Sequence, residues 1–157
     1  MSARQIYFED LTVGQIDNFG SYPVTREDVI AFATKFDPQS FHIDDAAAAA
    51  NPVFGRISAS ALHTMAMTGR MLADRSKDTG LWAAAGLGLE EMRVLKPVFP
   101  EDVLRVETEI THLRESKSQP DMGIVTMRVR TLNQHDEPVM QFFSVQMFKR
   151  RAPAPAA

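Results

Sequence analysis

The second half of the chain alternates apolar and polar side chains with a period of two, and this pattern constrains the fold more than any other feature. The alternation covers residues 104–111, 125–130 and 139–147. Successive side chains of a β-strand point to opposite sides, so the pattern predicts strands with one apolar face. Short connections between them predict antiparallel pairing, and a shorter strand is expected over residues 90–95. The apolar sets expected on the first and last strands are Leu104, Val106, Thr108 and Ile110, and Val139, Phe143, Val145 and Met147.

The first half of the chain has the signals of helices separated by loops. Thr25 is followed by acidic residues and an apolar pattern of helical spacing, which predicts a helix that Asp37-Pro38 ends. A short alanine-rich helix is expected over residues 44–50. The longest helix is expected to begin near residues 58–60 and to run to about Ala73. Small residues and methionine cover so much of its surface that we expect other elements to enclose it on several sides.

These patterns together predict an α+β fold, in which an antiparallel sheet curls around the long apolar helix. The chain has 157 residues, a length that suits one domain. We expect this domain to occupy residues 1–151. Residues 152–157 are alanine and proline only and are expected to be disordered.

Composition excludes several functional classes. The sequence has no cysteine, which rules out disulfides, a cysteine nucleophile and thiolate metal sites. The net charge of −3 and the dispersed basic residues argue against a nucleic-acid binder or an anionic-membrane binder. An acidic pair, Glu9-Asp10, lies where a signal peptide would need apolar residues, and no stretch is long and apolar enough to span a membrane. The expected location is the cytoplasm.

The densest group of reactive side chains lies in residues 36–44, where Asp37 and His42 flank a proline-containing loop. In a helix this spacing would place them on different faces, whereas an irregular loop lets both turn toward one water molecule. A carboxylate can take a proton from that water, and an imidazole can orient it or pass a proton on. Each residue also has a structural explanation, because aspartate before proline is common in turns and most histidines near aromatic rings are structural.

The segments 37–44 (DPQSFHID) and 51–64 (NPVFGRISASALHT) resemble the MaoC-like acyl dehydratases, which include the (R)-specific enoyl-CoA hydratases. The signature loop of that family reads roughly D-x-N-P-x-H, followed by a segment that opens the central helix. Residues 87–102 and 123–134 are similar to later blocks of the family, in the same order. The resemblance covers the chain from about Phe8 to Arg150.

The resemblance implies the hot-dog fold, a curled antiparallel sheet around a long central helix. It also implies that Asp37 is the general base that takes a proton from water and that His42 helps to bind and activate this water. The backbone N–H of Ala61, which matches the helix-opening glycine of the family, would stabilise the thioester oxygen. The implied reaction adds water reversibly to a trans-2-enoyl-CoA to give an (R)-3-hydroxyacyl-CoA, without metal or organic cofactor. The implied assembly is a homodimer or higher oligomer, and the open edge of such a sheet is an independent reason to expect pairing.

Five positions depart from the family pattern, and the first is Phe36, where the family often has a glycine. Gln39 and Ser40 replace its asparagine and proline, Ala61 replaces the helix-opening glycine, and Glu101 replaces the glycine of a later turn. Two alternatives remain open. One is a hot-dog acyl-CoA thioesterase, which would also bind acyl-CoA. The other is a hot-dog domain that binds an acyl thioester without catalysis, for which Gln39, Ser40 and Ala61 are the evidence. Thioesterases of this fold usually take a carboxylate from the central helix, and residues 60–73 contain none. The presence of both Asp37 and His42 argues against a binding module.

Other candidate residues carry weaker signals. Ser60 and Arg56 are candidate substrate-binding residues. Arg56 precedes the long helix and is expected either to meet a phosphate of CoA or to cap a loop. Phe36 and Phe41 are candidates for shaping the acyl pocket or the core. His63 on the long helix is expected to be structural or to lie at an interface. No set of histidines and carboxylates has the spacing of metal ligands, so no metal site is expected.

Overall fold

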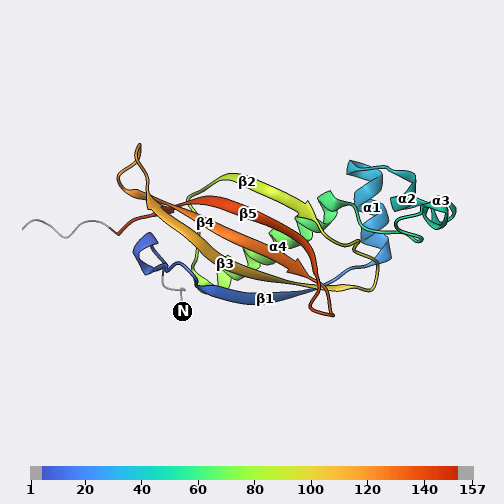
Figure 1. Cartoon of the computed structure of the whole chain (residues 1–157), viewed down its shortest axis with the longest axis horizontal. Helices are drawn as coiled ribbons and strands as arrows, with labels where there is room; N and C mark the ends of the chain where they lie inside the picture. The colour runs from blue at the N-terminus through green and yellow to red at the C-terminus, as the bar shows by residue number, and fades with distance from the viewer. Residues whose placement is uncertain (1–4, 152–157) are drawn as a thin grey trace, which may run out of the picture.

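A computed structural model describes residues 5–151, and the predicted disordered tail lies outside these residues. Five antiparallel strands form one sheet in the order β1-β3-β4-β5-β2 (Figure 1). The strands are β1 (Ile16–Pro23), β2 (Ala85–Val94), β3 (Val103–Glu115), β4 (Met122–Leu132) and β5 (Pro138–Lys149). The helices are η1 (Phe8–Asp10, a 3-10 turn), α1 (Arg26–Phe36), α2 (Ser40–Ile43), α3 (Asp45–Ala50) and α4 (Ala61–Thr79).

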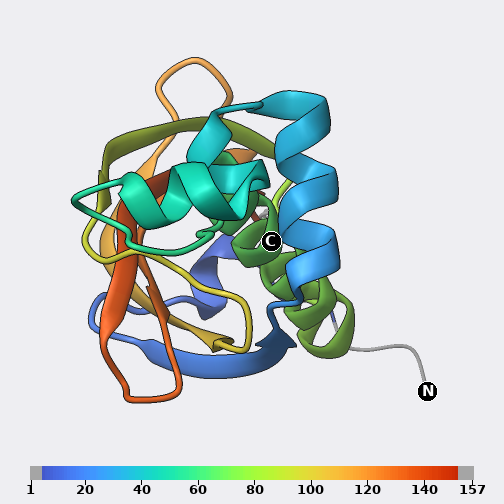
Figure 2. The same cartoon turned by 90° about the vertical axis from the view of Figure 1, so that its right-hand side faces the viewer.

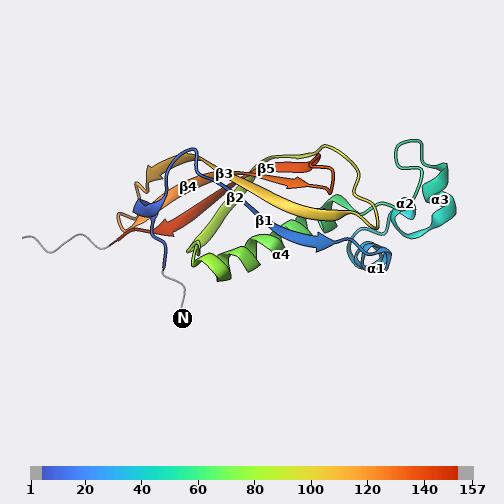
Figure 3. The same ribbon diagram turned by 90° about the horizontal axis from the view of Figure 1, so that it is seen from below.

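The long helix α4 lies along one side of the sheet, as the view from below shows (Figure 3). Its buried residues are His63, Thr64, Met67, Thr68 and Met71. Near the middle of this interface the Thr68 and Thr131 hydroxyls are hydrogen-bonded at 2.7 Å, which joins α4 to β4. The observed architecture is therefore the predicted α+β arrangement of a curled antiparallel sheet and one long helix.

The three shorter helices gather at one end of the molecule (Figure 2). The Thr25 hydroxyl caps α1 by accepting from Asp28 N–H at 3.2 Å, as the sequence predicts. The Asp44 carboxylate caps α3 in the same way, by accepting from Ala47 N–H at 2.8 Å. Within residues 5–151, none of the helices is both long and apolar enough to span a membrane.

The structure corrects several details of the sequence prediction. β1 was not predicted, because this edge strand is mostly exposed and carries polar residues, glycine and proline in place of an apolar alternation. β2 begins at Ala85, earlier than predicted. On β5, Phe142, Ser144 and Phe148 are buried against the core, while Phe143, Val145 and Met147 lie half-buried on the outer face. Val139 is buried in the core as predicted, but both faces of β5 are rich in apolar residues, so the alternation alone placed Phe143, Val145 and Met147 on the wrong face.

Helix α4 differs from its prediction in length and in environment. It continues beyond Ala73 to Thr79, where Gly80 ends it with a left-handed backbone at φ 74°. The ion pair of Arg70 with Asp74, at 2.8 Å, supports this additional part. Within residues 5–151 the sheet covers one face of the helix and Phe32 of α1 covers His63, but the face of Leu62, Ala66, Gly69 and Ala73 is exposed.

The turn before β3 explains why a glycine is expected at position 101. Glu101 has a left-handed backbone with φ 78°, a region that glycine enters without steric cost. Its N–H donates to Val24 O at 2.8 Å, which holds the turn against the end of β1. The Asp102 carboxylate accepts from Phe99 N–H at 2.8 Å and from the Gln134 side chain at 2.9 Å. These hydrogen bonds hold the turn in its left-handed conformation although residue 101 is a glutamate and not a glycine.

Candidate functional site

Asp37 and His42 are held by local structure at the end of the molecule where α1 to α3 gather. Asp37 is the C-cap of α1, and its N–H donates to Ala33 O at 2.9 Å. Pro38 follows and prevents the helix from continuing. His42 lies on α2, a single helical turn in a segment that the sequence analysis treated as irregular. This turn directs the imidazole inward, so that the His42 side chain is only 7% exposed.

The hydrogen bonding of His42 defines its tautomer. His42 Nδ1 lies 2.6 Å from the backbone oxygen of Ser58, which can only accept a hydrogen bond. Nδ1 therefore carries the hydrogen, and Nε2 of the neutral ring is an acceptor. Nε2 lies 3.7 Å from Asp37 Oδ2. Two acceptors at this separation can share one donor between them, as the sequence analysis expected for a water molecule.

The start of α4 closes the site from the other side. Ser60, the N-cap of α4, donates its hydroxyl hydrogen to Asp37 Oδ2 at 2.6 Å and accepts from Leu62 N–H at 3.2 Å. Ala61 is the first residue of the helix, so its N–H has no acceptor within the helix. The structure thus brings together Asp37, His42, Ser60 and Ala61. The contact between Ser60 and Asp37 spans 23 positions of the chain, and no spacing pattern indicated it.

These groups lie beside a cleft of about 560 Å³. Asp37, His42 and Ala61 belong to its lining, and Asp37 is the single carboxylate among the described residues that line it. The other walls are largely apolar and come from α2, the 53–54 loop, the end of β2 and the start of β5. They include Phe41, Val53, Phe54, Val94, Leu95, Val98 and Val139. Such a cleft suits an apolar chain attached to a polar group.

Two of the predicted residues lie elsewhere. Arg56 is exposed and does not line the cleft; its guanidinium lies over the Phe99 ring, 4.0 Å from the ring centre. Phe36 is 57% exposed and contributes neither to the cleft nor to the core, whereas Phe41 lines the cleft. Within residues 5–151, no three histidine or carboxylate side chains form a group that could hold a metal ion.

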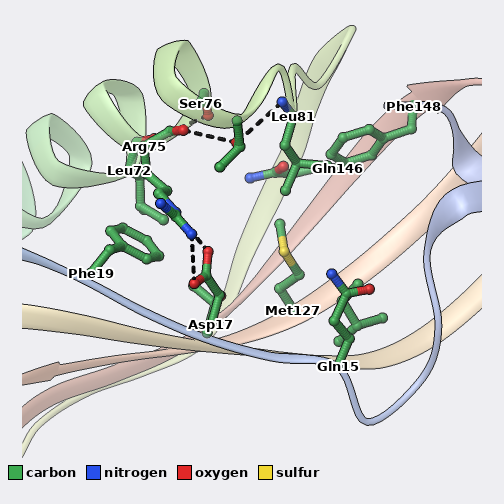
Figure 4. A pocket seen from close by; sticks show the side chains of 13 residues that line it. Gln15, Asp17, Phe19, Leu72, Arg75, Ser76, Leu81, Met127, Gln146 and Phe148 are labelled. Carbon is green, nitrogen blue, oxygen red and sulfur yellow. Dashed lines mark hydrogen bonds and ion pairs between the residues drawn. The ribbon is translucent and has the colours of Figure 1, made fainter. Parts of the chain in front are cut away.

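A second hollow lies toward the other end of α4 (Figure 4). Its lining includes Leu72, Met127 and Phe148, and the ion pair of Asp17 with Arg75 lies beside it. Its volume of about 80 Å³ holds only a few water molecules. It contains neither Asp37 nor His42, so the cleft at the start of α4 is the candidate site.

Comparison with known families agrees with the geometry. Residues 11–132 match the model of the MaoC like domain. This chain is a member of the MaoC-like dehydratase family. Membership supports hydratase or dehydratase chemistry in general.

Solved structures of this family share the fold. The MaoC-like dehydratase from Rhodospirillum rubrum is 38% identical, and the match covers 93% of this chain and 98% of that one with a TM-score of 0.83. The (R)-hydratase from A. caviae involved in PHA biosynthesis is 26% identical over 91% of this chain and 99% of its own, with a TM-score of 0.68. The predicted hot-dog fold is confirmed.

A curated relative matches a shorter part of the chain. Mesaconyl-CoA hydratase from Cereibacter sphaeroides is 45% identical over 82 residues, which are 50% of this chain. The matched region is 24% of the length of that hydratase.

His63 lies next to the site on α4 and has a different environment. Its ring stacks on Phe32 with 4.5 Å between centres, and Nδ1 is buried without a hydrogen-bond partner among the described residues. Burial lowers the pKa of His63 below its usual value, and the charge of Asp28 offsets only part of this effect.

This environment predicts a loss of stability in acid. Below about pH 6.5, the ordinary pKa of histidine, the unfolded chain binds a proton at position 63 that the native protein resists. The free energy of unfolding therefore falls as the pH drops from 7.5 to 5.5. His63→Gln should reduce this acid-induced drop in Tm by a few degrees, measured by thermal unfolding at both pH values. The exposed His135→Gln is the control and should keep the wild-type drop; an equal drop in His63→Gln would contradict the assignment.

Proposed function

We propose that the protein adds water reversibly to a trans-2-enoyl-CoA to give an (R)-3-hydroxyacyl-CoA. Asp37 is the general base, His42 holds the water, and the Ala61 N–H stabilises the thioester oxygen. The observation that carries this proposal is the juxtaposition of the Asp37 carboxylate and His42 Nε2, 3.7 Å apart, at the start of a long helix in an apolar cleft. Membership of the MaoC-like dehydratase family supports the same chemistry.

The hydrogen bonds of His42 explain how a water molecule would be oriented. Nδ1 is committed to Ser58 O, so Nε2 accepts one hydrogen of the water. The Asp37 carboxylate accepts the other. A water held by both hydrogens directs its lone pairs away from the two residues and toward the cleft. The attacking oxygen therefore faces the bound enoyl group.

The remaining steps move charge toward the start of α4. Asp37 takes a proton from the water as the hydroxyl adds to C3 of the enoyl group. Negative charge then develops on the thioester oxygen, where the Ala61 N–H and the positive end of the 19-residue helix α4 stabilise it. C2 then takes up the proton that Asp37 removed from the water, which completes the product and restores the carboxylate. The two parts of one water molecule thus end on adjacent carbons.

We propose a CoA thioester with a short or branched acyl group as the substrate. Phe41 and Phe54, whose ring centres lie 5.1 Å apart, form an apolar part of the cleft wall that suits such a group. The partial similarity to mesaconyl-CoA hydratase adds support, since the mesaconyl group is short and branched. We therefore propose mesaconyl-CoA and crotonyl-CoA as the first substrates to test.

The thioesterase alternative lacks the carboxylate that it needs. Helix α4 extends beyond residues 60–73 and therefore contains two carboxylates, Asp74 and Asp78, that the sequence prediction did not include. Asp74 is paired with Arg70, and neither residue lines the cleft. Asp37 is thus the carboxylate available to the cleft, and it is the base of the hydratase mechanism.

We also propose that the protein works as a homodimer paired through β2. All ten residues of this edge strand are exposed, on both of its faces. Leu87, Leu89, Met92 and Val94 are each exposed by 45% or more. A long apolar edge with unpaired backbone groups is a template for pairing with a second chain. Val94 and Leu95 also line the cleft, so a partner on β2 would lie beside the substrate.

The proposed activity predicts a specific pair of absorbance results. Purified protein mixed with crotonyl-CoA or mesaconyl-CoA should remove the absorbance of the enoyl thioester, while a thiol reagent detects no released CoA. Thiol release would contradict the hydratase and support the thioesterase. If the absorbance stays constant and no thiol is released with either thioester, the proposed activity is contradicted. Direct titration of binding would then test the non-catalytic alternative.

The proposed dimer predicts a change in mass when charge is added to β2. Light scattering should give about twice the chain mass of 17.5 kDa for the wild-type protein. Leu87→Lys with Leu89→Lys should give a folded monomer, because like charges brought together and buried at the strand edge oppose pairing. Val13→Lys is the matched control, since Val13 is also exposed at 56% but lies outside β2. A wild-type monomer, or a dimer that the β2 variant leaves intact, would contradict this interface.

A further inference from the structure

The contacts of the Ser60 side chain differ from those expected of a substrate-binding residue. The residue is fully buried, and its side chain is absent from the cleft lining. Its hydroxyl makes two hydrogen bonds, one to Asp37 Oδ2 at 2.6 Å and one from Leu62 N–H at 3.2 Å. The single hydroxyl hydrogen is therefore used on Asp37. A buried hydroxyl with these two bonds has little capacity left to bind a substrate.

The bond to Ser60 restricts the Asp37 carboxylate. The backbone of Asp37 is held at the end of α1, but its side chain is 25% exposed at the cleft. Oδ2 receives the Ser60 hydrogen and also lies 3.7 Å from His42 Nε2. The hydrogen bond from Ser60 to Oδ2 therefore restricts the rotation of the Asp37 carboxylate relative to the His42 imidazole. Hydrogen bonds to charged groups are among the stronger ones, so this restraint is substantial.

We propose that Ser60 is a positioning residue that sets the orientation of the Asp37 carboxylate, in place of the substrate-binding role that the sequence suggested. This inference rests on the proposed hydration activity. The Ser60 hydroxyl links two requirements of the reaction, because the same oxygen that orients the base also caps the helix whose first N–H faces the thioester oxygen. The base and the oxyanion donor are thereby fixed relative to each other by one side chain.

The capping role must be separated from the positioning role. Loss of an N-cap costs about 0.5–2 kcal/mol of stability when alanine replaces serine, but only a few tenths when glycine does. Ser60→Ala and Ser60→Gly both remove the hydrogen donated to Asp37, and only the first is expected to weaken the cap appreciably. Thr25→Ala is the matched control, because Thr25 caps α1 by accepting from Asp28 N–H and makes no contact with the site.

The test compares kcat, KM and Tm of these variants on the enoyl-CoA that the wild-type protein hydrates fastest. Ser60→Ala and Ser60→Gly should both lose about 10- to 100-fold in kcat, with KM changed less than about threefold. Ser60→Gly should keep a Tm near that of the wild type. Thr25→Ala should lose Tm and retain kcat.

Three outcomes would overturn the inference. A raised KM with unchanged kcat would show that Ser60 binds substrate. Full activity in Ser60→Gly with a loss in Ser60→Ala would show that only the cap matters. Wild-type kcat in both variants would show that Asp37 is oriented without Ser60. Failure of the proposed function itself is distinguishable, because the wild-type protein would then be inactive in the same assay.

Discussion

The burial of α4 against the apolar face of the sheet is the constraint on which the rest of the structure depends. Strand residues such as Val106, Val129 and Phe142 are fully buried in the core that this helix helps to form. Each such side chain contributes roughly 1.5–3 kcal/mol by leaving water. The hydrogen bond between Thr68 and Thr131 then fixes the position of the helix along the sheet. A shift of one turn would leave the buried Thr131 hydroxyl without this partner, at a cost of about 1–3 kcal/mol, whereas Thr68 would keep its bond to Thr64 O within the helix.

A fixed helix also fixes the short segment that leads into it, and this segment organises the site. Ala59 N–H donates to Val98 O at 2.7 Å, which attaches the segment to the chain that leaves β2. Ser58 O holds the His42 imidazole, and the Ser60 hydroxyl holds the Asp37 carboxylate. Residues 58–61 therefore orient both reactive groups of the 37–42 segment. These bonds attach the site to the core, although Asp37 and His42 lie at the end of the molecule, on the C-cap of α1 and on α2.

Local patterns in the sequence predicted much of this arrangement. Alternation identified β3 and β4 with their buried faces. The capping residue Thr25 and the alanine-rich run after Asp44 located two helices. Asp37 and His42 were found from their residue types and from the resemblance to a family. The contacts that connect Asp37 to Ser60 and His42 to Ser58 cross 23 and 16 positions, and these depend on tertiary packing that no local pattern contains. The exposed face of α4 was not predicted, for a related reason. Small and apolar residues all round a helix indicate that other elements cover it, but they do not show whether those elements belong to the same chain.

The assignment of Asp37 as the base can be tested most directly by replacing it with asparagine. The amide oxygen can still accept the Ser60 hydrogen, so the fold and the position of the side chain should be kept, but an amide cannot take a proton from water. Asp45→Asn is the control, because Asp45 lies nearby on α3 and is paired with Arg26 outside the cleft. We expect Asp37→Asn to lose about 100- to 10,000-fold in the rate of enoyl-CoA hydration at an unchanged Tm, and Asp45→Asn to retain the wild-type rate. Hydration by Asp37→Asn at the wild-type rate would contradict the account.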